Sequence, residues 1–336
     1  MKENTSVVVT TIANPNEALK SLARGCKESG YKFIVVGDIS SPTEFFIDGC
    51  DYYSYEDQLE LEMKFAKLCP QRHYARKNIG YLLAIRERMS IIIDTDDDNS
   101  PYSSFWDERQ RSNDSNVVEK SGWVNIYRYF SKTNIWPRGF PLGEIHSKVP
   151  KFESLNIQSL DCPIQQGLAD DDPDVDAIYR LTTPVGNPFK NKERQIALSA
   201  GAWCPFNSQN TAWWKDAFPL LYLPAYCSFR MTDIWRSFIA QRIAWANNWN
   251  ILFHGATVTQ ERNEHDLMKD FLDEIPGYLN NEKICEELYK LNINSGMNNI
   301  QLNLMICYEK MVHLGLIDKK ELKLLDAWLF DLNSFS

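Results

Sequence analysis

The sequence has no long hydrophobic run, no pair of cysteines at metal-binding spacing and no basic segment. A membrane-spanning helix needs about 20 consecutive apolar residues, so we expect no membrane span in this chain. The eight cysteines are scattered without a Cys-x-x-Cys pair, which argues against a structural zinc site and favours reduced thiols. A net charge of −9 without a basic run disfavours a nucleic-acid partner.

Targeting signals, internal repeats and low-complexity linkers are also lacking. The N-terminus leads almost at once into a strand-like segment with no signal-peptide pattern, so the chain as given is expected to be soluble and cytoplasmic. Its 336 residues are 44% hydrophobic and 24% charged, an ordinary globular composition. The aromatic content of 12%, with ten Trp, is rich. Such a content suits stacking on sugars and equally suits a large core.

The first hundred residues alternate between short apolar segments and amphipathic ones. Strands are predicted over residues 6–12, 32–37, 51–55 and 90–93, and helices over 17–29, 58–68 and 75–88. Asn16 has the chemistry of a helix N-cap, and Gly30 fits the C-terminal stop of the same helix. Strand and helix in alternation are typical of a doubly wound α/β fold with a parallel sheet.

The rest of the chain is predicted to continue this fold and then to become helical. Later strands are expected over 178–181, 195–201, 220–224 and 251–254, with a helix over 232–247. From residue 281 onward the pattern is helical throughout. We therefore predict an α/β domain over residues 1–279 and a helical extension over residues 280–336, through which any oligomer would form.

An acidic cluster ends the strand predicted over residues 90–93. Asp94, Asp96, Asp97 and Asp98 lie within five positions, and Asn-Ser-Pro follows with turn chemistry. Carboxylates so close together repel one another in a partly desolvated site, and a divalent cation is the usual relief. A solvated acidic turn is the alternative. The place after a buried strand, at the edge where open α/β sheets bind ligands, favours the metal site.

Polar residues at other strand ends would share that edge of the sheet. Thr11 and Asp38 follow the first two strands, so a nucleotide along the edge would have its base near them and its diphosphate near the acidic cluster. Asp38 is equally compatible with a turn. Arg76 and Lys77 open the helix before the acidic strand, where they oppose the helix dipole unless an anion is bound. Two solvated cations are the alternative.

Three later segments carry further candidates. An acidic loop around Pro173 could accept hydrogen bonds from sugar hydroxyls or be solvated; it contains Asp172, Asp174 and Asp176. Asp233 lies at a predicted helix start, as a cap or as a general base, between the anion-binding candidates Arg230 and Arg236. His254 ends a predicted strand beside Gly255, ahead of the polar stretch 260–265, and is a metal ligand or a structural histidine.

Four stretches together resemble the STELLO glycosyltransferase family, which are nucleotide-sugar enzymes of the GT-A type. They are Asp-Thr-Asp-Asp-Asp-Asn, Gly-Leu-Ala-Asp-Asp-Asp-Pro-Asp-Val-Asp-Ala-Ile-Tyr-Arg-Leu, Ala-Trp-Cys-Pro-Phe-Asn-Ser-Gln-Asn-Thr and Phe-Arg-Met-Thr-Asp-Ile-Trp-Arg-Ser. The short Asp-x-Asp motif is weak alone, but the longer strings are specific together. The likeness runs from Ser6 to Leu279 and leaves the helical tail outside it.

The resemblance implies a GT-A-like (Rossmann-like) α/β domain, with a mixed, mostly parallel sheet flanked by helices. It implies metal-dependent transfer of a hexosyl or pentosyl group from a UDP-sugar to the hydroxyl of a glycan or other acceptor. Mn²⁺ or Mg²⁺ would be held by Asp96 and Asp98 with Asp94 in support. His254 would be a later metal or phosphate ligand, and Asp233 the base of an inverting reaction. Plant relatives carry a membrane anchor and lie in the Golgi lumen; the sequence as given shows no such anchor, so we do not expect that location to carry over.

Three other functions remain open on the sequence. A UDP-sugar mutase similar to the plant reversibly glycosylated polypeptides would share the Asp-Asp-Asp tip. A haloacid-dehalogenase-type phosphatase would use Asp94 and Asp96 as nucleophile and acid, but its motif wants Thr or Val where this chain has Asp98. A non-catalytic scaffold that binds a glycan or a nucleotide would keep the same fold.

Overall fold

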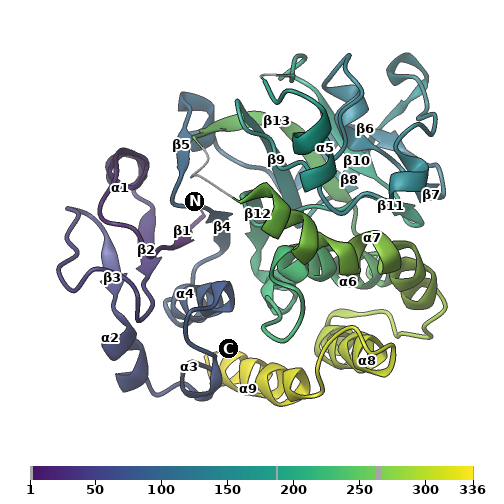
Figure 1. Cartoon of the computed structure of the whole chain (residues 1–336). Helices are drawn as coiled ribbons and strands as arrows, with labels where there is room; N and C mark the ends of the chain where they lie inside the picture. Colours follow the sequence, from purple (N-terminus) through teal and green to yellow (C-terminus); the bar gives the residue numbers. More distant parts are fainter. Residues whose placement is uncertain (1–2, 187, 262–265, 336) are drawn as a thin grey trace.

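The computed structural model describes residues 3–186, 188–261 and 266–335 (Figure 1). The helices are α1 (Glu17–Ser29), α2 (Tyr55–Glu60), α3 (Lys64–Leu68), α4 (Lys77–Arg86), α5 (Ala177–Thr182), α6 (Thr232–Ala246), α7 (Leu267–Tyr289), α8 (Ile300–His313) and α9 (Lys320–Ser334). The strands are β1 (Thr5–Thr10), β2 (Lys32–Val36), β3 (Asp51–Tyr53), β4 (Ile91–Thr95), β5 (Asn99–Pro101), β6 (Ser112–Val118), β7 (Gly122–Trp123), β8 (Asn156–Asp161), β9 (Ile164–Asp170), β10 (Gln195–Leu198), β11 (Ala202–Trp203), β12 (Asn210–Trp214) and β13 (Ile251–Gln260).

One large sheet crosses the molecule in the order β3-β2-β1-β4-β12-β9-β13-β10-β6-β8, and β5 pairs with β13 at the side of this path. Strands β3, β2, β1 and β4 are all parallel to their neighbours within that group. Strand β12 is antiparallel to both β4 and β9, while β13 runs parallel to β9. The predicted mixed sheet flanked by helices is confirmed.

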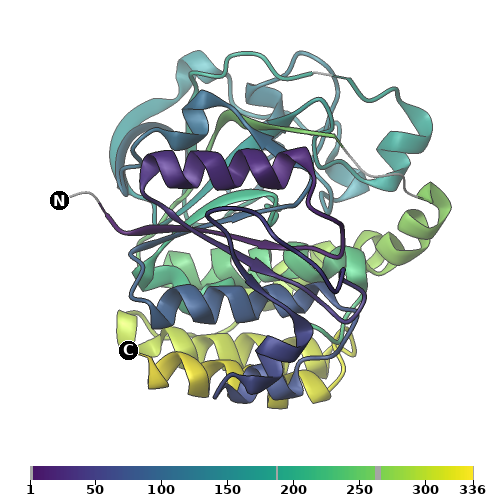
Figure 2. The same ribbon diagram turned by 90° about the vertical axis from the view of Figure 1, so that its left-hand side faces the viewer.

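Helices cover both faces of the sheet because its strands are apolar on both faces. Val7 and Val9 pack in the core under α1, whereas Val8 faces the opposite core with Ile79 of α4. Figure 2 shows α1 on one face, α4 and α6 on the other, and the yellow C-terminal helices in a further layer beyond them. The alternation of side chains along a strand thus builds two separate cores.

Helix α1 begins and ends where its cap residues predict. The Asn16 side chain accepts a hydrogen bond from Leu19 N, and Gly30 adopts the left-handed conformation with φ of 70°. The helix predicted over 58–68 is instead divided into α2 and α3, because the backbone at Leu61 is extended.

Two predicted strands are wrong. Residues 178–181 lie in helix α5, whose first turn is capped by the Asp176 side chain through Tyr179 N. Residues 220–224 do not form a strand. They comprise the end of the 3₁₀ segment Lys215–Leu221 and the three residues after it. Both segments are rich in apolar residues, and a short apolar run does not by itself distinguish a strand from a buried helical turn.

The C-terminal helices pack on the α/β sheet domain. Helix α7 passes through the predicted boundary between residues 279 and 280. Asp331 of α9 accepts hydrogen bonds from Lys64 N and Phe65 N at the start of α3. None of the helices in the described part of the chain has the length and apolarity needed to cross a bilayer.

Candidate active site

A cavity of about 550 Å³ lies at the C-terminal ends of β1, β2 and β4, and we call it the strand-end pocket. Its first wall consists of Thr10, Thr11, Ile12, Asp38, Ser40, Arg72, His73, Tyr74 and the acidic residues Asp96, Asp97 and Asp98. Its second wall consists of Arg138, Asp174, Arg180, Asn207, Ser208, Gln209, Phe229, Arg230, Asp233 and Gln260. The pocket therefore joins the predicted ligand-binding edge of the sheet to segments from the second half of the chain.

The three consecutive carboxylates of the acidic cluster are held by different partners. Asp96 Oδ1 accepts a hydrogen bond from Tyr74 Oη at 2.8 Å and lies 3.0 Å from Lys77 Nζ. Asp97 Oδ2 accepts one from Thr11 Oγ1 at 2.5 Å. Both oxygens of Asp98 lie 3.0 Å from Gln260 Nε2. These contacts fix three carboxylates along one side of the pocket.

The three pocket-facing carboxylates of the acidic cluster are partly buried. Burial raises the pKa of Asp96 and of Asp97 above the usual range of a carboxyl group. Burial, together with the charge of Asp96, raises the pKa of Asp98 to about 7. A group of carboxylates that resists ionisation in this way is stabilised by an added positive charge.

Asp94 lies beneath the pocket and is fully buried. Its Oδ1 is 2.6 Å from Lys77 Nζ, and its Oδ2 is 3.1 Å from Arg236 Nη1. Burial acts to lower the pKa of Lys77, but the charges of Asp94 and Asp96 outweigh it and hold the pKa above its usual range. Lys77 and Arg236 therefore neutralise the floor of the pocket from inside the protein.

The predicted nucleotide-binding end of the pocket is built by a small network. Asp38 Oδ2 accepts a hydrogen bond from His73 N at 2.9 Å, and Asp38 Oδ1 accepts one from Ile39 N at 2.7 Å. Ser41 Oγ accepts from Asp38 N and donates to Thr11 O, both at 2.8 Å. Thr11 and Asp38, which come from different strands, are brought together as predicted.

Arg138 organises the opposite wall. Its Nη1 and Nη2 donate to the two oxygens of Asp233 at 3.1 and 2.9 Å, and its Nε donates to Asp174 Oδ1 at 2.7 Å. Asp233 Oδ2 also lies 3.3 Å from both Ser208 N and Ser208 Oγ. Burial acts to raise the pKa of Asp233, but the charges of Arg138, Arg236 and Arg230 outweigh it and hold the pKa at about 2.

The acidic loop contributes to the pocket in part. Asp174 lines it, and Asn207 Nδ2 donates to Asp174 Oδ2 at 2.8 Å. Asp172 is outside the lining and forms an ion pair with Arg180, which does line the pocket. Asp176 is the N-cap of α5 and accepts a hydrogen bond from Trp136 Nε1 at 2.6 Å.

Several predicted site residues do not reach the strand-end pocket. The fully buried guanidinium of Arg76 donates to Gln58 Oε1 at 2.6 and 2.8 Å and to Cys69 O at 3.1 Å, so it points into the interior. His254 lies in β13, where its Nδ1 is 2.9 Å from Gly255 O. Burial and the charge of Arg109 lower the pKa of His254 to about 4. Residues 262–265 lie outside the described residues.

Sequence reasoning missed four lining residues that carry charge or can transfer protons, namely Arg72, His73, Arg138 and Arg180. Arg180 lies in one of the four stretches that resemble the STELLO family, so that stretch was a usable signal. Arg138 lies in an irregular segment without any period, and only its contact with Asp233 in three dimensions reveals its place. Arg72, beside His73, has φ of 53° and sits at the mouth of the pocket.

The donor set of the strand-end pocket fits a hard divalent cation only in part. Among residues 3–186, 188–261 and 266–335, no three His, Cys, Asp or Glu side chains form a complete cation site. Asp96 and Asp98 nevertheless supply carboxylate oxygens at one cavity, with pKa values raised by burial. A cation bound there would take its remaining ligands from a phosphorylated substrate or from water. The residues present thus supply part of the ligand set of a hard cation, and the remaining ligands would have to come from outside the protein.

Comparisons with known proteins confirm the resemblance to the STELLO family. A family model described as STELLO glycosyltransferases matches residues 230–336, so the likeness includes the C-terminal helices. The chain is 28% identical over 352 residues to "Probable glycosyltransferase STELLO2" of Arabidopsis thaliana and 27% identical over 347 residues to "Probable glycosyltransferase STELLO1". Each match covers 97% of this chain and 44% of the relative, so the chain spans less than half of these proteins.

Solved structures with a similar arrangement include a mycobacterial protein and the glucosyl-3-phosphoglycerate synthase of M. tuberculosis. The first has a TM-score of 0.40 and 12% identity and covers 83% of this chain and 74% of that structure. The second has a TM-score of 0.40 and 11% identity and covers 83% of this chain and 80% of that structure.

Proposed function

We propose that this chain, like the STELLO proteins it resembles, is a glycosyltransferase of the GT-A type that uses a UDP-sugar donor and a divalent cation. The observation that carries the proposal is the row of three desolvated carboxylates, Asp96, Asp97 and Asp98, along one side of the strand-end pocket. Ionised carboxylates there would repel a diphosphate, and a cation between them would remove that repulsion. The same pocket has polar groups at the ends of β1 and β2 for a nucleoside.

The chain's own residues divide the work along the pocket. Thr11, Asp38 and Ser40 would bind the nucleoside end, where the backbone is fixed by the Ser41 hydroxyl. Asp96 and Asp98 would hold Mn²⁺ or Mg²⁺, which when bound offsets negative charge on the leaving diphosphate. Arg72 at the pocket mouth would contact phosphate oxygens directly, since guanidinium groups match their geometry.

The second wall would receive the sugar and the acceptor. Asp174, Asn207 and Ser208 offer hydrogen-bonding groups for sugar hydroxyls, and Arg138 holds Asp174 in place. If the reaction proceeds with inversion, Asp233 is the candidate for the general base. Its pKa of about 2 and its two contacts with Arg138 equally suit a role in which Asp233 anchors that arginine.

The direct test is calorimetric titration of UDP in the presence and in the absence of Mn²⁺, followed by a screen of UDP-sugars for hydrolysis. We expect UDP to bind only with the cation, and one sugar donor to be hydrolysed slowly when no acceptor is present. Binding of UDP that is equally strong in a metal chelator would contradict the cation site. Binding without any turnover, across all donors and acceptors tested, would favour a non-catalytic nucleotide-binding protein.

A UDP-sugar mutase is the second candidate, because the Asp-Asp-Asp tip also suits an enzyme that rearranges the sugar of its own donor. Incubation with each UDP-sugar and no acceptor distinguishes the two reactions. A mutase returns an isomeric UDP-sugar, whereas a transferase returns UDP and free sugar.

A further inference from the structure

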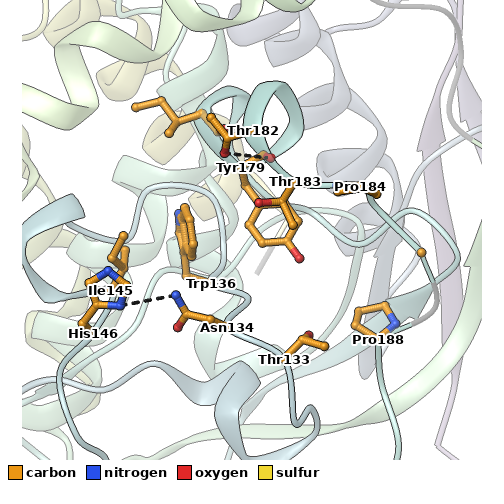
Figure 3. Close-up of a pocket in the computed structure, with 12 residues that line it drawn as sticks. Thr133, Asn134, Trp136, Ile145, His146, Tyr179, Thr182, Thr183, Pro184 and Pro188 are labelled. Carbon is orange, nitrogen blue, oxygen red and sulfur yellow. Dashed lines mark hydrogen bonds between the residues drawn. The ribbon is translucent and has the colours of Figure 1, made fainter.

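A second cavity, of about 620 Å³, lies beside the strand-end pocket, and we call it the lateral cavity (Figure 3). It is formed by described residues of three segments that are distant in sequence: 133–136, 145–146, and 178–186 together with Pro188. Its lining residues are Thr133, Asn134, Trp136, Ile145, His146, Ile178, Tyr179, Thr182, Thr183, Pro184, Gly186 and Pro188. It is separate in lining from the strand-end pocket, since the two share no residue.

The lining of the lateral cavity differs in chemistry from that of the strand-end pocket. Among its twelve described residues there is no Asp, Glu, Lys or Arg, whereas the strand-end pocket contains both acids and arginines. Burying an ion without an opposite charge is costly. Apart from His146, the described lining of the lateral cavity therefore offers no charged group to pair with a phosphate, a carboxylate or a metal ion.

Two polar groups in the lateral cavity lack partners within the described part of the chain. Asn134 Oδ1 is buried and accepts no hydrogen bond, although Asn134 Nδ2 lies 3.4 Å from His146 Nδ1. The Tyr179 hydroxyl points into the open space, as Figure 3 shows, and its ring packs edge-to-face on Trp136 with centroids 5.0 Å apart. An apolar ligand would take water from the Tyr179 hydroxyl and leave this group unpaired, at a cost of about 1–3 kcal/mol.

Two short segments contribute neighbouring residues to the lateral cavity and to the strand-end pocket. Tyr179 lines the cavity and the next residue, Arg180, lines the pocket. Trp136 and Arg138 are divided in the same way. Asp176 joins the two segments, because it caps α5 through Tyr179 N and accepts from Trp136 Nε1. A ligand bound in the lateral cavity would thus lie against the far side of the second wall of the strand-end pocket.

We propose that the lateral cavity binds a neutral sugar unit of an oligosaccharide acceptor, away from the unit that reacts. A neutral sugar offers hydroxyls as partners of the Tyr179 hydroxyl and as acceptors for Asn134 Nδ2. Its C–H faces suit the apolar walls formed by Ile145, Pro184 and Pro188. The assignment of this ligand as acceptor rests on the proposed transferase function, whereas binding of the sugar itself does not.

The test is titration of the whole protein with neutral β-gluco-, β-xylo- and β-manno-oligosaccharides of increasing length, followed by NMR saturation transfer or calorimetry. Oligogalacturonides serve as the charged probe. We expect at least one neutral series to bind, with affinity that rises with chain length. Replacing Tyr179→Phe removes only the hydroxyl, and Asn134→Leu removes the amide. Each should weaken binding roughly two- to tenfold, as expected for one neutral hydrogen bond.

Tyr289→Phe is the matched control, because Tyr289 is 62% exposed on α7 and outside the cavity. Unchanged oligosaccharide affinity in both cavity variants, or binding of no neutral series at all, would overturn the proposal, as would tighter binding of the oligogalacturonides. UDP affinity should be the same in all variants. If the parent protein does not bind UDP, only the transferase proposal is contradicted, because the oligosaccharide titration needs no sugar donor.

Discussion

At the scale of the residue, the sharpest feature is that Asp96 and Asp98 face the strand-end pocket while Asp94 is already neutralised below it. Asp96→Asn and Asp98→Asn should each weaken Mn²⁺-dependent UDP binding by at least the roughly 10–100-fold that loss of a supporting residue costs a metal site. Calorimetry with and without Mn²⁺ measures this change. Asp107→Asn, at an exposed position outside the pocket, is the control. Parent-like affinity in both pocket variants would exclude this cation site.

Two neighbouring arginines separate a phosphate contact from a structural one. Arg72 is exposed at the mouth of the strand-end pocket, and Arg72→Ala should weaken UDP roughly 10–100-fold, as for one charge-assisted hydrogen bond. Uridine binding should change little, since uridine has no phosphate. Arg76 is buried with partners in the interior. Arg76→Ala should lower the melting temperature and leave the ratio of UDP to uridine affinity unchanged. If Arg76→Ala weakened UDP binding without weakening uridine binding, the two assignments would be reversed.

Asp233 tests whether the second wall contains a base or an anchor. Asp233→Asn loses the charge that pairs with Arg138, and removing one partner of a buried ion pair costs about 3–5 kcal/mol. An anchoring role therefore predicts lower melting temperature and lower turnover together, and similar losses in Arg138→Gln. A general base predicts, for Asp233→Asn and not for Arg138→Gln, a fall in turnover of roughly 10²–10⁴-fold at temperatures where the variant is still folded, with UDP affinity kept. Turnover and thermal melting on both variants distinguish the two roles.

At the scale of the element, α4 positions Lys77 by packing closely on the sheet. A Cβ atom built on Gly80 of this helix would lie 2.6 Å from Val8 Cγ1 and 2.9 Å from Val36 Cγ2. Gly80→Ala should therefore destabilise the protein, because overpacking costs about 1–3 kcal/mol and the gain in helix propensity is about 1 kcal/mol. Gly143→Ala, where no atom lies within 4 Å, is the matched control. Equal denaturant midpoints for the two variants would contradict this packing argument.

The strands that follow the pattern of apolar side chains were predictable, and the strands that bury polar ones were not. β1, β2 and β4 are apolar on both faces, and their positions agree with the prediction to within a few residues. β12 lies between β4 and β9 but begins with the polar residues Asn210 and Thr211, and no strand was predicted there. The Thr211 hydroxyl donates to Gln166 Oε1 of β9 and to Asn207 O. Such cross-strand pairing is visible only in three dimensions.

The part of the candidate site that lies at strand ends was predictable from the sequence, and the part that depends on long-range contacts was not. Residues at strand ends meet at one edge whatever the rest of the fold, so Thr11, Asp38 and the acidic cluster could be brought together from the sequence. Arg138 reaches Asp233 across 95 positions of the chain, and no local pattern encodes that contact. Arg76 was misplaced because a helix start does not determine whether its side chain turns outward or, as here, toward Gln58.

At the scale of the whole molecule, the C-terminal helices are joined to the α/β sheet domain by a buried carboxylate. Glu321 of α9 is fully buried and accepts hydrogen bonds from the Tyr222 hydroxyl and from the backbone N–H groups of Ala225 and Tyr226. Burial raises the pKa of Glu321 to about 7, against the opposing effect of these hydrogen bonds. The helices that the sequence predicts as an extension are thus fixed to the core through a titratable group.

This arrangement makes the stability of the fold depend on pH. The pKa of Glu321 is raised in the folded state, so the folded protein holds a proton that the unfolded chain releases at lower pH. The contribution of Glu321 to stability is therefore fully present below about pH 4.5, the usual range of a glutamic acid, and is lost as the pH rises toward 7. Glu321→Gln keeps one hydrogen-bond acceptor and cannot ionise. The variant should be less stable than the parent at pH 5, because the side-chain NH₂ of the glutamine cannot accept hydrogen bonds from the backbone N–H groups. The difference in the free energy of unfolding should narrow by pH 8.

Denaturant unfolding of parent and Glu321→Gln at pH 5, 6, 7 and 8 measures the difference in the free energy of unfolding. Glu286→Gln is the control, since Glu286 lies on α7 and is exposed. Only the difference between parent and variant is informative, because the acidic cluster changes the stability of both proteins in the same way. A difference that stays constant or widens from pH 5 to pH 8 would mean that Glu321 is ionised throughout. The helices would then be held by a charge that the hydrogen bonds stabilise, and not by a protonated carboxyl group.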